Sequence, residues 1–294
     1  MGFRVVYIEE AISVRLYLDN VKIIKANKEL TIPLSDIHTL IIDNTETNIT
    51  IPLMNKCAEY NINLIFCSLE HLPQSSVIPF TGNYQHSLVL RKQMNWSDDL
   101  KKGLQKLIIQ NKISNQIDLL KKLNKSQSVC ETLYRFQSEV VDGDELNREG
   151  LAAKMYFREL FGPNFKRFNE DIINFGLNYG YAILRSQISK TIVAKGLEPC
   201  LGIFHRGAEN PFNLSDDIIE VFRPLIDNYV YVNMRNAIIF KRDHRLELIQ
   251  ETVKEVYIMN KKQTLFNAIS IFVDHIIDVF EKEDLSLYEE IRLL

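Results

Sequence analysis

The sequence lacks the signatures of several common protein classes. No apolar run approaches the roughly 20 residues that cross a membrane, and the first residues show no signal-peptide pattern. The four cysteines form no Cys-x-x-Cys pair and lie among apolar residues, so we assign them no chemistry. Only 11 glycines and 8 prolines occur in 294 residues, which excludes a low-complexity chain. We therefore expect a folded cytoplasmic protein with no membrane contact.

Two catalytic motifs are missing, and the charge is nearly balanced. Neither G-x-x-x-x-G-K-[ST] nor G-x-S-x-G occurs, which argues against a P-loop nucleotide site and a serine hydrolase. The net charge of -3 does not indicate nucleic-acid binding, but residues 101–125 carry seven lysines and only Asp118 as an acid. A second basic cluster spans residues 235–245. Each is either a solvated face or, as a hypothesis, a contact with the DNA backbone.

Hydrophobic spacing divides the chain into a β-rich part and a helical part. Alternating patterns predict the early strands, with a hairpin turn at Asp19-Asn20, and helical spacing begins near residue 98. We predict an α+β fold, with a small β-rich domain over residues 1–90, its linker starting near 70, followed by a larger all-α domain over 91–294. The expected helices in the second part include 169–195, 214–227, 246–259 and 265–280.

The stretch from Gly202 to Asp227 is the first candidate site. His205 lies in a loop that leads into a helix carrying Asp216, Asp217 and Glu220. An imidazole and several carboxylates suit a hard divalent metal. The same spacing also suits a solvated helix start, with Ser215 as N-cap and acids complementing the helix dipole. From this segment alone the solvated surface is favoured.

Glu149 is the second candidate, because it falls beside a predicted buried face. The face contains Leu146, Ala153 and neighbouring core residues of a helix that we expect to open at Asp144-Glu145. A carboxylate at its edge needs a partner, which Lys154, Arg148 or a cation could supply. On spacing alone, a salt bridge is commoner than a metal.

Four motifs resemble those of one family. The chain contains L-x-I-P-L-S-D-I-H-T-L-I-I-D, R-E-G-L-A-A-K-M-Y-F, G-I-F-H-R-G and D-D-I-I-E-V-F-R-P, in this order. Together they resemble the CRISPR-associated adaptation integrase, in particular its shorter type II members. The resemblance implies a metal-dependent DNA endonuclease and integrase. Such an enzyme inserts short foreign DNA, the spacer, into a repeat array by attack of a 3′-hydroxyl on a phosphodiester.

The resemblance also implies which residues act. It places the catalytic metal ligands at Glu149, His205 and Glu220, with Mg²⁺ or Mn²⁺ as the ion. Asp217 matches a further acidic position, either behind the ligands or as another ligand. Some relatives carry Asp rather than Glu at position 220. Arg206 and Arg223 are candidates for contact with the scissile phosphate.

Partners follow from the same resemblance. It implies double-stranded DNA as substrate, a homodimer formed through the β-rich domains, and a small ferredoxin-like partner that completes a heterohexamer. Two other functions remain open from the residues. The chain could be a non-catalytic dimeric DNA-binding scaffold whose histidine and carboxylates form salt bridges, or a general metal nuclease acting on branched DNA or RNA.

Overall fold

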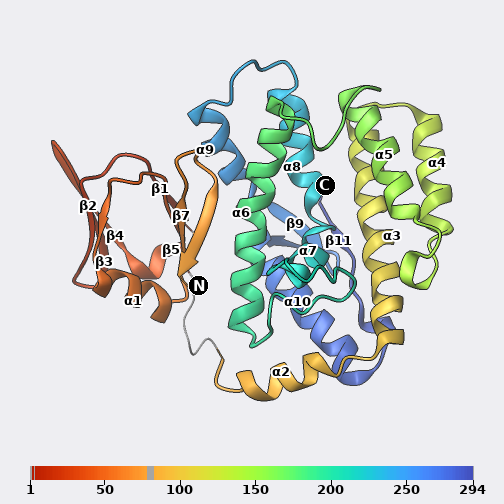
Figure 1. The fold of residues 1–294 in the computed structure, drawn as a ribbon, viewed down its shortest axis with the longest axis horizontal. Coiled ribbons are helices and arrows are strands. Elements are labelled where there is room, and N and C mark those ends of the chain that lie inside the picture. The colour runs from red at the N-terminus through yellow and green to blue at the C-terminus, as the bar shows by residue number, and fades with distance from the viewer. Residues whose placement is uncertain (1, 3, 78–82, 294) are drawn as a thin grey trace. The chain divides into compact units, whose positions relative to one another are not determined.

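The computed structural model describes residues 2, 4–77 and 83–293 (Figure 1). The chain divides into two compact units, one of residues 1–86 with 193–196 and the other of residues 87–192 with 197–294. The first is rich in strands, and the second is mostly helical. The predicted α+β class is therefore confirmed.

The first unit contains two four-stranded sheets. One has the order β1-β5-β7-β8, in which β5 lies parallel to β1 and β7, while β8 is antiparallel to β7. The other has the order β4-β3-β2-β6 and is antiparallel except at β6. Their strands are β1 Arg4–Ile8, β2 Ser13–Tyr17, β3 Asn20–Lys25, β4 Lys28–Pro33, β5 Ile37–Ile42, β6 Asn48–Ile49, β7 Asn63–Cys67 and β8 Pro73–Val77.

Strand β5 forms the centre of this unit. All six of its residues are buried, as expected for an apolar run between two parallel neighbours. Helix α1, Ile51–Glu59, contributes Leu53 and Cys57 to the same core. The β2–β3 turn lies at Leu18 and Asp19, both with positive φ, one residue earlier than predicted. Residues 73–77, within the linker expected from about 70, form strand β8, and its Pro79 and Gly82 lie outside the described residues.

The second unit is built mainly from helices. They are α2 His86–Met94, α3 Asp98–Lys122, α4 Gln127–Ser138, α5 Arg148–Phe161, α6 Ile172–Ala194, α7 Asn213–Ile219, α8 Arg223–Tyr229, α9 Arg242–Glu251 and α10 Leu265–Lys282. Short 3₁₀ turns occur at 142–144 and 285–287 in this unit and at 34–36 in the first one, and a π-helical segment, Val230–Met234, continues α8. None of the helices within the described ranges has the length and apolarity to cross a membrane.

Helix α3 runs beside α4 and α5 (Figure 1), and most residues in its middle are buried. Besides Ile108, Ile113 and Ile117, it buries the polar residues Asn111, Lys112, Asn115 and Gln116. Asn115 donates to the Val221 carbonyl at 2.8 Å. The lysines over 101–125 therefore do not all lie on one exposed face, because Lys112 is buried in the middle of α3.

Two glycines let α6 pack closely against its neighbours. A Cβ on Gly176 would lie 2.6 Å from Met234 Cε, and one on Gly180 would lie 2.5 Å from Ile226 Cγ2. Real Cβ atoms do not tolerate such distances. Gly180 therefore sets how closely α6 approaches α8, whereas a Cβ at Gly176 would meet the flexible end of Met234.

The helical unit also contains a small sheet that the sequence pattern did not predict. Its order is β10-β9-β11, with β9 Glu255–Ile258, β10 Lys261–Thr264 and β11 Ile291–Arg292. The helix expected over 246–259 was therefore wrong beyond Glu251, and the unit is not purely helical. The missed signal has period two, because Val256 and Ile258 are buried while Glu255 and Tyr257 are exposed.

The helix expected over 214–227 is broken into α7 and α8. Proline at position 224 lacks an N–H, and its ring clashes with the carbonyl four residues earlier, which belongs to Glu220. The break therefore falls at residues 220–222. Ser215 is not the N-cap, since α7 starts at Asn213 and the buried Ser215 hydroxyl bonds to Ser189 at 2.8 Å.

Candidate metal centre

Two carboxylates from different parts of the helical unit converge on one ammonium group. Glu149 Oε1 lies 2.6 Å from Lys112 Nζ, and Glu220 Oε2 lies 2.5 Å from the same nitrogen. The Lys112 side chain is only 8% exposed. Two of the predicted ligands therefore face a single point, and a cation occupies that point.

Helix α5 holds Glu149 at its first turn. The Asp144 carboxylate accepts the backbone N–H groups of Arg148 and Glu149 at 2.8 and 3.0 Å, so the helix opens at Arg148. The buried face contains Ala152, Tyr156 and Leu160, which differs from the expected one. Glu149 lies one turn before Ala152 on this face. Its partner is Lys112 rather than the expected Arg148 or Lys154.

Glu220 lies at the break that Pro224 imposes between α7 and α8. Its side chain is 5% exposed, and Arg223 Nε donates to its Oε1 at 2.9 Å. Burial raises the pKa of this carboxyl, but the charges of Arg223 and Lys112 outweigh burial and lower the pKa to about 2. Glu220 is therefore ionised at neutral pH.

Lys112 was missed by sequence reasoning, which grouped it with the other lysines of 101–125. Burial lowers the pKa of its amine, but the charges of Glu149 and Glu220 more than compensate and raise the pKa to about 12. The ammonium form is thus maintained. The sequence did contain a signal for this burial. Apolar residues occur on more than one face of the helix, so the helix cannot be buried on one side alone.

His205 is held by Asp217. Its Nδ1 lies 2.7 Å from Asp217 Oδ1, which also accepts the backbone N–H of His205 at 2.9 Å. Asp217 Oδ2 accepts the N–H groups of Ile203 and Phe204. Burial lowers the pKa of His205, but bonding to Asp217 raises it overall, whereas burial raises the pKa of Asp217.

The contact with Asp217 determines how the imidazole of His205 is oriented. Within the described part of the chain, His205 Nε2 forms no hydrogen bond, and a carboxylate on the opposite nitrogen is the usual arrangement behind a metal-bound histidine. Gly202 allows the loop to close around Asp217. A Cβ on Gly202 would lie 2.2 Å from the His205 carbonyl oxygen and 3.0 Å from Asp217 Oδ2.

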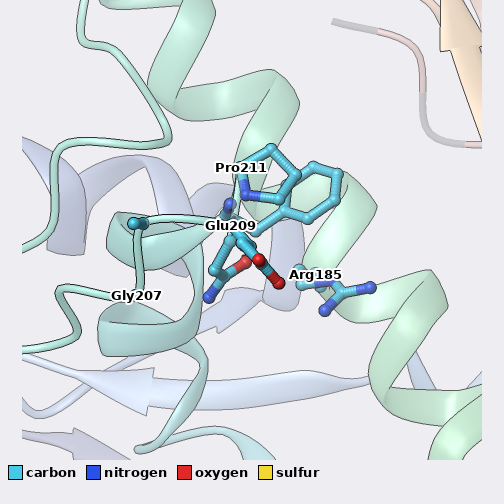
Figure 2. Close-up of a pocket in the computed structure, with 7 residues that line it drawn as sticks. Arg185, Gly207, Glu209 and Pro211 are labelled. Carbon is cyan, nitrogen blue, oxygen red and sulfur yellow. Dashed lines mark hydrogen bonds between the residues drawn. The ribbon is translucent and has the colours of Figure 1, made fainter.

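The loop after His205 forms a separate open pocket of about 780 Å³ (Figure 2). Arg185 from α6 lies against Gly207–Phe212, with its guanidinium 4.6 Å from the Phe212 ring centroid. Arg185 also pairs with Asp216 at 3.7 Å. Arg206 is exposed and pairs with Asp98 at 3.2 Å. Asp216 and Arg206 thus have partners other than Glu149 and Glu220.

The polar face of the 214–227 segment is not solvated surface. Asp217, Glu220 and Asp227 are at most 4% exposed. Asp227 accepts hydrogen bonds from Tyr156, at 2.8 Å, and from Tyr181. Burial raises the pKa of Asp227 to about 6, despite these two hydrogen bonds and the nearby arginines. The interpretation of this segment as a solvated surface is therefore wrong.

The residue set fits a divalent metal in its chemistry. Across residues 2, 4–77 and 83–293, no three His, Cys, Asp or Glu side chains gather closely enough to hold an ion. However, Glu149 and Glu220 already face one cation, and His205 retains Nε2 for a ligand. Oxygen and imidazole donors suit Mg²⁺ or Mn²⁺. In this structure the Lys112 ammonium group lies between the carboxylates of Glu149 and Glu220.

The fold combines a β-rich unit with a helical unit, and the helical unit holds Glu149 and Glu220 on one buried ammonium group and His205 on Asp217. The family model described as CRISPR associated protein Cas1 matches residues 6–258. The chain belongs to the Cas1 family, which confirms the resemblance drawn from its motifs.

Two relatives of known sequence support membership of this family. The CRISPR-associated endonuclease Cas1 of Neisseria meningitidis serogroup C (strain 8013) is 41% identical over 197 residues, which are 67% of this chain and 64% of that protein. The alignment thus spans just under two thirds of that relative. A CRISPR-associated endonuclease Cas1 of Francisella tularensis subsp. novicida (strain U112) is 27% identical over 285 residues, 89% of each chain.

Solved structures share the fold. A Cas1 protein from Thermotoga maritima superimposes with a TM-score of 0.76 at 16% identity, over 95% of this chain and 97% of that one. A casposase bound to its integration product gives a TM-score of 0.75 at 17% identity, over 96% of this chain and 91% of that one. At these identities the likeness establishes the architecture alone.

Proposed function

We propose that this Cas1-family chain is a DNA endonuclease and integrase of spacer acquisition, and that Glu149, His205 and Glu220 form its metal-dependent catalytic centre. The observation that carries the proposal is the convergence of Glu149 and Glu220 on one buried cation. A bound Mg²⁺ or Mn²⁺ supplies Lewis-acid activation for phosphodiester transfer.

The chain's own residues provide binding and orientation. Glu149 and Glu220 bind the ion through their carboxylates, and Asp217 holds His205 so that Nε2 is the ligand atom. Arg223 keeps Glu220 ionised and offers its remaining N–H groups to a phosphate. Lys112 would compete with a bound ion, since its ammonium group contacts both carboxylates that would hold the metal.

The reaction exchanges one ester bond for another. The 3′-hydroxyl oxygen of the incoming DNA forms a bond to phosphorus, the P–O3′ bond of the target strand breaks, and the hydroxyl proton passes to the released 3′-oxygen through solvent. Water as attacking group gives cleavage instead. No external energy source is needed, because the number of phosphodiester bonds is unchanged on joining.

The proposed partners have support from other family members. Solved structures are described as a Cas6-RT-Cas1–Cas2 complex and a TtCas1–DNA complex, with TM-scores of 0.77 and 0.57 to this chain. For this chain we propose double-stranded DNA as substrate, a homodimer through the β-rich unit, and a small ferredoxin-like partner in a heterohexamer. Of the lysines over 101–125, the exposed Lys121 and Lys122 remain candidates for backbone contact.

Strand transfer tests the catalytic centre. A labelled short duplex with free 3′-hydroxyls is incubated with a plasmid carrying a repeat array, the partner subunit, and Mn²⁺ or EDTA. We expect joining with Mn²⁺ that falls by at least about 10³-fold in Glu220→Ala, since losing a ligand removes the metal's contribution. Glu131→Gln, on the exposed surface of α4, serves as the control and retains activity.

Other outcomes distinguish the alternative functions. Equal inactivity of wild type and Glu220→Ala, with intact DNA binding, favours the non-catalytic scaffold. Metal-dependent cleavage of branched DNA or RNA with no requirement for a 3′-hydroxyl favours the general nuclease. Joining that is unimpaired in Glu220→Ala removes Glu220 from the centre.

A further inference from the structure

The ion pairs of Lys112 balance the charge of the candidate metal centre. Its ammonium group contacts Glu149 and Glu220, and Arg223 also donates to Glu220. These side chains, two carboxylates and two cations, have no net charge. A divalent ion held by the same carboxylates adds two positive charges beside Glu220, whose side chain is only 5% exposed. Unbalanced charge is costly in such surroundings, so the ion needs an accompanying anion.

The Lys112 ammonium group is able to leave its position between the carboxylates. It is carried on a flexible four-carbon chain and has three rotatable donors, so it can move while helix α3 stays in place. Within the described ranges, no carboxylate besides Glu149 and Glu220 lies within ion-pairing distance of its nitrogen. A displaced ammonium group therefore lacks an anion inside the protein, and a buried charge without a partner is strongly unfavourable.

A neutral acceptor for the displaced group lies one turn further along α3. Gln116 is 2% exposed, and its Oε1 has no hydrogen-bond donor among the residues that the structure describes. Residues four apart on a helix are neighbours, and a helical side chain leans towards the preceding turn, so we expect Gln116 to lean towards Lys112. A buried carbonyl oxygen without a donor is unfavourable, and the Lys112 ammonium group can satisfy it. The amide supplies a hydrogen bond but no charge.

The missing charge is available from the substrate of the proposed reaction. A phosphodiester carries one negative charge, and the reacting one lies beside the metal ion that activates it. Lysine is a common ligand of phosphate groups, which it contacts as a point charge. One phosphate at the centre therefore offsets part of the charge that the ion adds. It also gives Lys112 an anion in place of the two carboxylates.

We propose that Lys112 binds the reacting phosphate of the substrate. In the protein without metal and DNA its ammonium group lies between Glu149 and Glu220; when both bind, it moves to the phosphate and to Gln116 Oε1. The proposal rests on the proposed function for the metal centre and for DNA as the substrate. Metal and DNA binding are then coupled, because each makes the other more favourable through the same ammonium group. The free protein has a weakened affinity for the ion, and DNA restores it.

The affinity for Mn²⁺ with and without DNA tests this coupling. Electron paramagnetic resonance measures free Mn²⁺ while the full-length protein is titrated, alone and with a short duplex. The duplex carries 3′-dideoxy ends, which cannot be joined, and the Mn²⁺ bound by the duplex alone is subtracted. We expect DNA to tighten Mn²⁺ binding to wild type by about tenfold or more.

Lys112→Met removes the ammonium group that competes for the carboxylates. Without DNA this variant should bind Mn²⁺ about tenfold more tightly than wild type. DNA should then tighten Mn²⁺ binding by a factor at least about fivefold smaller than in wild type, because only the direct contact between ion and phosphate remains. Lys106→Met, which removes a lysine of the same helix that pairs with Asp142, should keep both wild-type values.

Two further variants test the proposal if Lys112→Met fails to fold. Lys112→Arg keeps the charge but presents a planar fork that binds carboxylates through two hydrogen bonds, so Mn²⁺ binding without DNA should weaken about tenfold. Gln116→Leu replaces a buried amide by an apolar side chain of similar size, which should leave the fold intact. It removes the second acceptor for the ammonium group, so Mn²⁺ binding should weaken about threefold.

The outcomes separate this proposal from the catalytic one. Tighter Mn²⁺ binding by Lys112→Met, together with reduced coupling to DNA, upholds it. Equal coupling in wild type and Lys112→Met overturns it, even if both bind Mn²⁺ and Glu220→Ala has lost strand transfer. Unchanged Mn²⁺ affinity in both Lys112→Arg and Gln116→Leu overturns it as well. Absence of Mn²⁺ binding from every sample overturns the metal centre itself, and this proposal with it.

Discussion

The two units of this protein bury different kinds of side chain. In the β-rich unit the core is formed by apolar strands such as β5, and Asp43 is the only buried carboxylate among its described residues. The helical unit buries Lys112, Asp217, Glu220, Asp227, Arg245 and Glu251. Burying charge is costly unless each group has a partner, so such a concentration indicates a site maintained for chemistry. We therefore expect the stability of the first unit to depend on the volume of its apolar side chains. We expect the stability of the second unit to depend on its buried charges, on metal binding and on pH.

The largest effect is expected from Lys112→Met, which removes the cation between Glu149 and Glu220 and leaves only Arg223 to balance Glu220. In EDTA we expect the free energy of unfolding to fall by about 3–5 kcal/mol, because a buried ion pair has lost one partner. Mn²⁺ should restore part of this loss and bind more tightly than to wild type, since no ammonium competes. Urea unfolding and Mn²⁺ titration followed by electron paramagnetic resonance measure the two quantities.

Lys106→Met is the matched control for that experiment. Lys106 lies on the same helix but pairs with the exposed Asp142 at 3.3 Å. Its loss should cost less than about 1 kcal/mol and leave Mn²⁺ affinity unchanged. If Lys112→Met binds Mn²⁺ no better than wild type, then Lys112 does not occupy the metal position.

Leu40→Ala tests the apolar core of the β-rich unit. Leu40 is fully buried in β5, so its truncation should cost about 3 kcal/mol through lost burial and a cavity. The loss should be the same in Mn²⁺ and in EDTA and constant between pH 5 and 8. Urea unfolding under these conditions checks it, and a metal-dependent loss would contradict the separation of the two units' chemistry.

Asp227→Asn should reveal a pH dependence. The pKa of Asp227 is raised from its ordinary value of 3.8 to about 6, so between these values the folded protein holds a proton that the unfolded chain has released. The resulting stability is fully present below pH 3.8 and is lost as the pH rises through about 6. When the pH falls from 8 to 4, the free energy of unfolding of wild type should therefore rise by up to about 3 kcal/mol relative to that of the variant. Parallel urea titrations measure this, and a constant difference would show that the carboxyl is not shifted.

The smallest effect on stability is expected from Lys121→Glu/Lys122→Glu, because both side chains are exposed at the end of α3. The free energy of unfolding should change by no more than about 0.5 kcal/mol. If these lysines contact the DNA backbone, duplex affinity should fall and its dependence on salt should become shallower by roughly two phosphates. Unchanged binding and salt slope would leave them as solvated surface.

Much of the fold followed from local patterns, and the failures have identifiable causes. Strands with period two in the first unit were predicted from residue type and spacing. The short strand β9 was read as helix because four residues contain little periodic information. The α7–α8 break was missed although Pro224 was visible, because the apolar stripe around it continues through the break.

The site was predicted only in part. His205, Asp217 and Glu220 are close in sequence, so their proximity could be inferred from a loop followed by a helix. The distance of Asp217 from Nδ1 of His205, and thus the orientation of the imidazole, depends on a loop that closes around Gly202. Nothing in the neighbourhood of Glu149 indicated that Lys112 would meet it.

The sequence by itself determined the types of element, the family through its ordered motifs, and the residues suited to a metal. These depend on backbone sterics, on local periodicity and on the chemistry of single side chains. The tertiary structure decided that Lys112 lies between Glu149 and Glu220, that Asp227 is buried, and that Arg223 lines a second pocket. Such contacts join residues far apart in the chain, and they depend on how α3, α5 and α8 pack, which no local pattern specifies.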